Sequence, residues 1–376
     1  GFLGDFDETL FAFSPNQSFP YIDQSKDADG SWAESANAKV SYKLDNIDII
    51  FGKYNQHWGN GKRALHISNK PPSYPQFGFD WKFFDNLKLI FFHGFLYSDI
   101  VDSNRSNIYQ NFDKRYVNIK RNIAAHRLQW KVNNKITLIA SESVVYAGRE
   151  IDIHYLLPFI PFYAMENYLG DTDNIQMGCD ISYDFNQNIL FYIGFFMDEL
   201  TPEWLFNKKN HNWFGWQFGL EVNNIFLDDN LRFEINWIDQ RVFKHKYSIN
   251  DFYSHNQPLG FWAGPHSEEY IFDYYITFGR LKYLFEFSTT KRGIFTEDMV
   301  EKNYSDTQSG RYENGYEKRT IYSASLRSKS KIKHLNYYLS LGYITFANAS
   351  LQYQTNQLNI IKSKKLSLEL GLQYNL

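Results

Sequence analysis

Apolar and polar residues alternate along much of this chain. The alternation is clearest from Leu366 onward, where the two faces consist of Leu366, Leu368, Leu370, Leu372, Tyr374 and Leu376 on one side and Ser367, Glu369, Gly371, Gln373 and Asn375 on the other. Strict alternation over eight or more residues is typical of a β-strand, because successive side chains point to opposite faces. Residues 38–43, 214–221, 231–237 and 322–327 repeat the pattern. The sequence therefore predicts many strands, each with one apolar and one polar face.

Short and long connections alternate between these strands. Tight turns are predicted at five Asn/Asp-rich sites, whose side chains favour turn geometry: Asp45-Asn46, Asp85-Asn86, Asn133-Asn134, Asn186-Gln187-Asn188 and Asp228-Asp229-Asn230. Long connections are predicted at about 55–75, 98–123, 146–174, 199–213, 241–268 and 291–318. One further strand near residues 5–13, followed by an outer loop at about 14–34, brings the strand count to about 16.

The composition narrows the fold class. The chain has 376 residues with 34 Phe, 28 Tyr and 9 Trp, yet its mean hydropathy is −0.49. A transmembrane barrel has this composition, because lipid-facing apolar residues alternate with polar lumen residues and aromatic residues gather at both interfaces. No stretch approaches the roughly 20 apolar residues of a membrane helix; the richest, Tyr155 to Tyr163, carries Pro158 and Pro161. A large soluble β-sandwich or propeller is the alternative.

We therefore predict an all-β fold, a transmembrane antiparallel β-barrel of about 16–18 strands in a bacterial outer membrane. Short turns on one side and long loops on the other are typical of such barrels, and the long loops are expected to be extracellular and to plug the lumen partly. The aromatic segment from Glu150 to Asp171 is expected to fold into the lumen and obstruct it. One domain is predicted over residues 1–376, with an N-terminal segment, first strand and loop at 1–35 and the main barrel at 36–376.

Charge and cysteine content exclude several functions. The formal net charge is −3 and the sequence pI is about 6.4, so no basic excess is available to bind nucleic acid. Cys179 is the single cysteine, which excludes an intramolecular disulfide. The chain starts at Gly1 without a basic and apolar leader, so a signal peptide is expected to lie upstream or to have been removed.

The last residues resemble the signal that the barrel-assembly machinery reads. Its pattern of a polar residue, a glycine, an aromatic residue and a final hydrophobic residue is matched by Glu369, Gly371, Tyr374 and Leu376. The resemblance implies that the assembly machinery is a partner during biogenesis and that membrane lipid surrounds the finished barrel.

Three loop segments resemble the capsule assembly protein Wzi family. The first is FGKYNQHWGNGKRALHISNKPPSYP (Phe51 to Pro75). The second runs through HRLQWKV (His126 to Val132) into SESVVYAGREIDIHYLLPFIPFY (Ser141 to Tyr163) and ENYLGDTDN (Glu166 to Asn174), and the third is PLGFWAGPHSEEY (Pro258 to Tyr270). Members of the family are outer-membrane barrels implicated in attaching capsular polysaccharide to the cell surface. The resemblance implies surface polysaccharide as the partner. The family's N-terminal helices are not evident in this sequence, and its 18 strands exceed our count by two.

The segments that resemble Wzi are rich in residue types that bind carbohydrate. Aromatic faces pack on pyranose rings, and Arg, Lys and carboxylates bind hydroxyl or acidic groups. The candidate glycan-binding residues are Trp58, Lys62, Arg63, Arg149, Asp152, Tyr155, Glu166, Asp171, Asp173 and Trp262. The competing interpretation makes Trp58 a loop-packing residue and the charged residues after Arg149 a structural ion-pair network.

Other chemistry finds little support in the sequence. Asp171, Asp173 and Asn174 lack the spacing of an EF-hand calcium loop, and the histidines lack metalloprotease spacing. No Gly-x-Ser-x-Gly nucleophile motif is present. We predict no enzyme, no metal site and no cofactor. The alternative function is a general or substrate-selective diffusion porin, with these lumen charges setting its selectivity: Lys39, Lys43, Arg232, Lys282, Arg327, Glu221, Glu234, Glu286 and Glu369.

Overall fold

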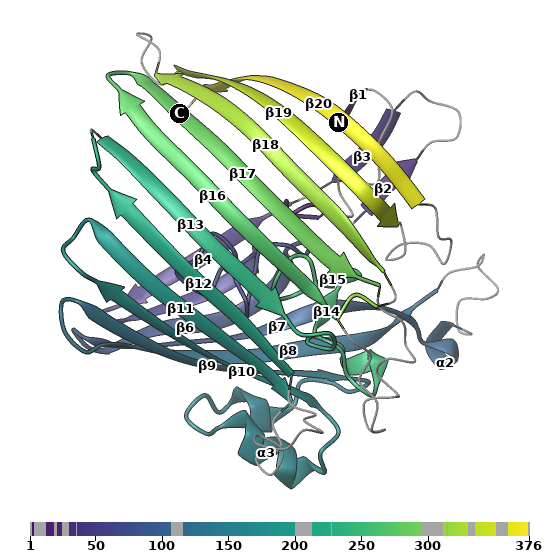
Figure 1. Ribbon diagram of the computed structural model, residues 1–376. Helices are drawn as coiled ribbons and strands as arrows, with labels where there is room; N and C mark the ends of the chain where they lie inside the picture. Colours follow the sequence, from purple (N-terminus) through teal and green to yellow (C-terminus); the bar gives the residue numbers. More distant parts are fainter. Residues whose placement is uncertain are drawn as a thin grey trace.

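A large antiparallel sheet, curled around a filled interior, dominates the computed structural model (Figure 1). The structure describes residues 2–3, 13–18, 21–24, 30–34, 36–106, 116–199, 213–226, 228–294, 311–313, 315–329, 335–350 and 360–374. The sheet has 15 strands in the order β20-β19-β18-β17-β16-β13-β12-β11-β10-β9-β8-β7-β6-β5-β4. Apart from the two-strand hairpin that interrupts the numbering, each strand pairs with the next one along the chain. We call this sheet the wall.

The strands of the wall are mostly 11 to 16 residues long, enough to cross a bilayer at a tilt. Their bounds are β4 Ala38–Leu44, β5 Ile47–Tyr54, β6 Tyr74–Phe84, β7 Leu87–Val101, β8 Asn118–Lys131, β9 Ile136–Ala147, β10 Asn174–Asp184, β11 Ile189–Glu199, β12 Trp213–Asn223, β13 Asp228–Ile238, β16 Ser267–Phe278, β17 Leu281–Gly293, β18 Tyr316–Lys329, β19 Leu335–Ser350 and β20 Ile360–Tyr374.

Smaller elements lie at the start of the chain and in the long connections. A three-stranded sheet combines β1 Phe2–Leu3, β2 Tyr21–Gln24 and β3 Gly30–Glu34, and a hairpin combines β14 Tyr253–Ser254 with β15 Gln257–Pro258. The short helices are α2 Ser103–Ser106, η2 Ile153–Leu156, α3 Phe162–Leu169 and η4 Ser248–Asn250. Across the described ranges, no helix combines the length and the hydropathy needed to cross a membrane.

Alternation along β12 and β13 separates a lipid-type face from a filled interior, as predicted. In β12, the side chain of Phe218 is 46% exposed on the convex face, whereas its neighbour Gln217 is 1% exposed on the concave face. Their partners in β13 are Ile235 and Asn236, and Asn236 is fully buried. Because register fixes which side chains share a face, the apolar residues of β12 and β13 form one outer surface.

Four of the five predicted tight turns are confirmed, between β4 and β5, β6 and β7, β8 and β9, and β10 and β11. The fifth prediction was wrong by a few residues, because Asp228–Asn230 opens β13 and the turn precedes it. The carboxylate of Asp229 accepts hydrogen bonds from the backbone N–H groups of Ile225 (2.6 Å) and Phe226. Asp229 thus stabilises the turn although it lies in the strand that follows, and sequence alone does not distinguish such an Asp from a residue of the turn itself.

The wall is curled but not closed within the described residues, since β4 and β20 form its two edges without pairing to each other. The strand expected near Asp5 to Phe13 falls almost entirely outside the described residues; Phe13 itself is buried against the interior. The fold is that of an outer-membrane β-barrel, with 15 strands in the described sheet against the predicted 16–18. The prediction of one domain stays a prediction.

Candidate functional site: a filled lumen and its rim

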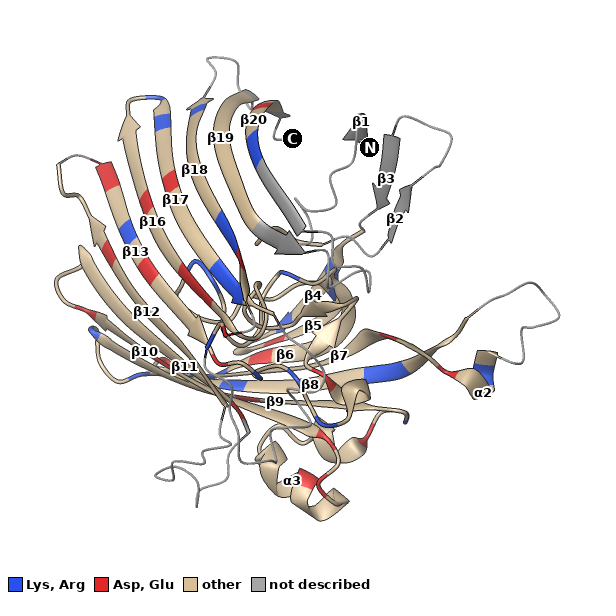
Figure 2. Cartoon of the chain, turned by 45° about the vertical axis from the view of Figure 1, so that its right-hand side comes forward, with Lys and Arg blue, Asp and Glu red and all other residues tan. Residues whose placement is uncertain are grey.

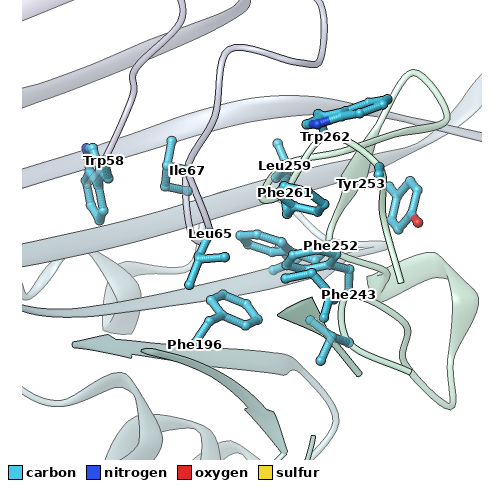
Figure 3. Close-up of a cluster of buried hydrophobic side chains, with 14 of the residues drawn as sticks. Trp58, Leu65, Ile67, Phe196, Phe243, Phe252, Tyr253, Leu259, Phe261 and Trp262 are labelled. Atoms are coloured by element: carbon cyan, nitrogen blue, oxygen red, sulfur yellow. The ribbon is translucent and has the colours of Figure 1, made fainter. Parts of the chain in front are cut away.

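Two long connections pack against the concave side of the wall and occupy much of its interior. They are residues 55–73, between β5 and β6, and residues 239–266, between β13 and β16, and we call them together the plug. Figure 3 shows their apolar side chains packed around Leu65, with Phe196 of β11 against them. Phe243, Phe252 and Phe261 are fully buried there. The prediction that long loops plug the lumen is confirmed, but by other loops than the one we expected.

The two halves of the plug contact each other through their backbones. The N–H of Ser68 donates to the carbonyl oxygen of Leu259 at 2.7 Å. Next to this bond, Gly260 lies so close to the first loop that a Cβ atom there would be 2.3 Å from the carbonyl oxygen of Leu65. Only glycine permits this approach without displacing one of the loops.

The tip of the first loop is bound to acidic side chains of the wall. The carboxylate of Glu234, fully buried on β13, accepts the backbone N–H groups of Lys62 (2.6 Å) and Arg63 (3.1 Å). The ammonium group of Lys62 lies 2.8 Å from Asp273 and 2.5 Å from Glu286. Figure 2 marks the acidic positions of β13, β16 and β17 in red, and Glu234, Asp273 and Glu286 on these strands bind the tip. These carboxylates hold the tip instead of lining open water.

Arg63 and Trp262 meet at one carboxylate. The guanidinium group of Arg63 binds both oxygens of Glu269, at 2.9 and 3.1 Å, and the indole N–H of Trp262 donates to the same group at 2.9 Å. The Glu269 side chain is fully buried. The structure therefore brings together three of the predicted glycan residues, Lys62, Arg63 and Trp262, inside the plug.

Trp58 also lies in the plug core. Its side chain is 4% exposed, its N–H donates to Gln56, and its ring meets His66 and Phe92 edge-on. Trp262 is equally buried, so neither indole presents a free face to solvent. This placement matches the loop-packing interpretation of Trp58.

His66 joins the first loop to β9. Its two ring nitrogens lie 2.8 Å from the hydroxyl oxygens of Ser141 and Ser143. Burial, reinforced by the nearby charge of Arg127, lowers the pKa of His66 to about 3. The imidazole is therefore neutral at neutral pH, and both of its nitrogens are satisfied inside the lumen.

Arg121 of β8 fastens the second half of the plug, a role that the sequence analysis did not assign. Its guanidinium group donates to the carbonyl oxygens of Ile249 (2.6 Å), Tyr253 (2.9 Å) and Ser248 (2.9 Å). Asn174 of β10 donates to the carbonyl oxygen of Asn250 at 2.8 Å. An inward Arg near the long-loop end of a strand is the available sequence signal, although it does not say which loop is bound.

The segment from Glu150 to Asp171 lies outside the lumen, which corrects our expectation. Residues 148–173, here called the outer segment, pack Tyr155 and Phe162 against Val144 and Tyr146 of β9. The residues of β9 that face the plug are the odd-numbered ones, such as Ser141 and Ser143, whereas Val144 and Tyr146 belong to the convex face. In Figure 1, α3 accordingly lies beneath β9 and β10, on the side away from the plug.

Polar side chains on the convex face explain this placement. His126 of β8 and Glu142 of β9 form a hydrogen-bonded pair there at 3.0 Å, and uncovered polar side chains facing hydrocarbon are costly. The backbone N–H groups of Phe162 and Tyr163, at the start of α3, donate to Glu142 at 2.7 and 2.8 Å. The outer segment therefore satisfies and covers polar residues that interrupt the lipid-type face.

An ion-pair network within the outer segment joins its two ends. Arg149 binds both oxygens of Asp173, at 2.8 and 2.5 Å, and lies 3.2 Å from Asp152. The hydroxyl of Tyr155 donates to Asp173 at 2.6 Å. Hydrogen bonding to Asp173 raises the pKa of Arg149 above its ordinary value. The four predicted residues Arg149, Asp152, Tyr155 and Asp173 thus form one structural network.

The remaining predicted residues do not belong to the clusters described above. Glu166 is buried on α3, and Asp171 is exposed at the end of that helix with a φ of 57°. Glu369 and Gly371 lie on β20, Tyr374 ends that strand, and Leu376 lies outside the described residues. Within the described part of the chain, no group of three or more His, Cys, Asp or Glu side chains is arranged to hold a metal ion.

Comparison with solved structures supports the fold. Wzi of Escherichia coli, described as an outer-membrane protein involved in group 1 capsule assembly and a carbohydrate-binding β-barrel, aligns with a TM-score of 0.59 and 14% identity over 90% of this chain and 70% of its own. OpdK of Pseudomonas aeruginosa, solved with vanillate, aligns with a TM-score of 0.50 and 8% identity over 96% of this chain and 82% of its own. No family model and no curated protein matches the sequence. At these identities the likeness concerns the fold alone.

Proposed function

We propose that this chain is an outer-membrane protein that binds surface polysaccharide at the rim of a plugged barrel. The observation that carries the proposal is the filled lumen: an apolar core and buried ion pairs occupy the concave side of the wall. Such packing obstructs the flow of solutes through the interior, so we assign ligand binding to the surface formed by the ends of the long loops. Membrane lipid and, during biogenesis, the barrel-assembly machinery are the other proposed partners.

Exposed aromatic and basic side chains at the long-loop end suit carbohydrate. Tyr116 is 70% exposed and Tyr247 is 49% exposed, with the ammonium group of Lys246 lying 5.3 Å from the Tyr247 ring. Tyr97 stacks on His255 at 4.5 Å between ring centroids. Aromatic faces beside cations bind the apolar side of sugar rings and the acidic groups of charged glycans. Many weak contacts of this kind retain a long polymer by avidity.

The predicted residues inside the plug and the outer segment then act indirectly. Arg63 and Trp262 hold the plug closed, and Arg149 with Asp173 fixes the outer segment. In this proposal they shape the rim, and the exposed tyrosines and Lys246 contact the glycan. A solved structure of similar fold is described as a carbohydrate-binding β-barrel, which supports carbohydrate as the class of ligand in this proposal.

Two measurements on the same protein test the proposal. Purified wild-type protein should conduct poorly in planar bilayers and should bind acidic surface polysaccharide from the producing cells. Replacing Tyr247 and Lys246 by Ala should weaken glycan binding several-fold without changing barrel abundance. The control variant Phe278→Ala, at the opposite end of the wall beside the tight turn of β16 and β17, should bind normally. Unchanged binding by the rim variant would contradict the proposal.

A diffusion porin is the second candidate, and one feature favours it. A polar pocket of about 250 Å³ remains beside the plug, lined by charged side chains that include Lys39, Asp80 and Arg127. In that case the pocket would be part of a narrow, charge-selective path along the wall. Large and stable conductance of the wild-type protein, together with no glycan binding, would favour the porin.

A further inference from the structure

The outer segment leaves an apolar groove between itself and the convex face of the wall. The groove has a volume of about 620 Å³, which lies within the range of about 300–1,000 Å³ that is common for ligand pockets. Leu128 of β8, Ala140 of β9 and Met177 of β10 form part of its floor, and Pro158 and Phe159 of the outer segment form its side. It therefore lies outside the lumen and apart from the rim.

The lining of the groove is mostly apolar and presents few free hydrogen-bonding groups to an occupant. Its ionisable pair, His126 and Glu142, is bound internally at 3.0 Å. Glu142 also accepts two backbone N–H groups of α3, and the ring of Phe162 stacks on His126 with 4.4 Å between centroids. An occupant therefore meets mainly carbon atoms, which excludes a sugar or a charged solute.

The position of the groove identifies its occupant. The strands beneath it belong to the membrane-crossing wall, and Leu128 (41% exposed) and Phe159 (65% exposed) continue the lipid-type surface. At its far end the groove reaches Phe84 and Leu87, which flank the tight turn between β6 and β7. An empty apolar groove forfeits dispersion contacts on its lining, and lipid chains are the molecules that surround it.

We infer that this groove is a binding site for one acyl chain of a membrane phospholipid. The chain enters from the leaflet on the side of the tight turns and lies between the outer segment and β8–β10. Ordinary lipid around a barrel touches one surface and exchanges freely, whereas this chain is enclosed on two sides by protein. The bound lipid would complete the packing of the outer segment. This inference does not depend on glycan binding or on conduction.

Native mass spectrometry of protein taken from phosphatidylcholine vesicles tests the site. Wild-type protein should keep one lipid at collision energies that remove all others. Ala140→Trp fills the groove from its floor and should lower the retained adduct at least tenfold. Ala324→Trp is the matched control, because Ala324 is an exposed position on β18 far from the groove, and it should keep the adduct.

Heat-modifiable migration of both variants in gels shows that each barrel has folded. An adduct of equal strength in Ala140→Trp and wild type would overturn the inference, as would the absence of any retained lipid in wild type. A second copy of the chain instead of a lipid on this face, seen as a dimer that Ala140→Trp abolishes, would also overturn it.

Discussion

Removing the guanidinium group of Arg63 should open the lumen. Arg63 and Glu269 form a two-point ion pair, with side chains 14% and 0% exposed. Truncating one partner of a buried pair costs about 3–5 kcal/mol, because the other charge is left buried. Glu269 keeps the N–H of Trp262 and the hydroxyl of Thr290 as donors, so Arg63→Ala should cost about 3 kcal/mol, near the lower limit.

This loss of free energy weakens the docking of the plug and leaves the stability of the wall unchanged, because Arg63 takes no part in strand pairing. A change of 1.4 kcal/mol is a tenfold change in an equilibrium, so the ratio of undocked to docked plug should rise by about two powers of ten. The backbone bonds to Glu234 and the ion pairs of Lys62 remain. We therefore expect frequent openings and not a permanently open channel.

Single-channel recording in planar bilayers measures this effect. Arg63→Ala should open about a hundredfold more often than wild type, in line with the same equilibrium shift. Arg149→Ala is the matched control, because Arg149 is held by two carboxylates outside the lumen, and it should stay closed. A folded Arg63→Ala barrel that conducts like wild type, or equal opening of Arg149→Ala, would refute the assignment of the plug.

Three further changes probe the wall and the plug. Phe218→Lys places a charge on the convex face and should lower the free energy of unfolding, measured by denaturant titration, by about 2–4 kcal/mol. The control Phe218→Leu should be as stable as wild type. Equal stability of the two variants would reject the assignment of Phe218 to the lipid-type face. Gly260→Ala forces a Cβ atom towards the carbonyl oxygen of Leu65 and should raise conductance without unfolding the wall. A Gly260→Ala protein that conducts no more than wild type would contradict the tight contact between the two loops. Because the pKa of His66 is lowered to about 3, the unfolded chain binds more protons, so stability should fall from about pH 6.5 towards pH 3, by up to about 1.4 kcal/mol per pH unit. His66→Asn should lose this dependence, and an unchanged pH profile in the variant would assign it to other groups.

The sequence predicts the wall well because strand faces are a local property. The side-chain period of two places Phe218 and Gln217 on opposite faces whatever their partners are. The tight turns also follow from local Asn and Asp chemistry. The displaced turn before Asp228 is an error of this local kind, since Asp229 acts on residues that precede it.

The destination of a long loop is not a local property, and there the prediction failed. The outer segment is aromatic enough to fill a lumen, yet its place depends on His126 and Glu142, which belong to the two strands before it. Their appearance on the apolar face of β8 and β9 is the signal that the sequence offered. Likewise, nothing in the first loop itself reveals that Arg63 binds Glu269, because the two lie 206 residues apart.

That separation also couples the filling of the interior to the arrangement of the strands in the wall. Lys62 and Arg63 follow β5, whereas the carboxylates that pair with their side chains lie on β16 and β17. The tip of the first loop can form these ion pairs only when the wall has curled far enough to bring β16 and β17 to it. A wall with these two strands out of place would leave two positive charges without their carboxylates, although Glu234 of β13 would still bind the backbone of the tip.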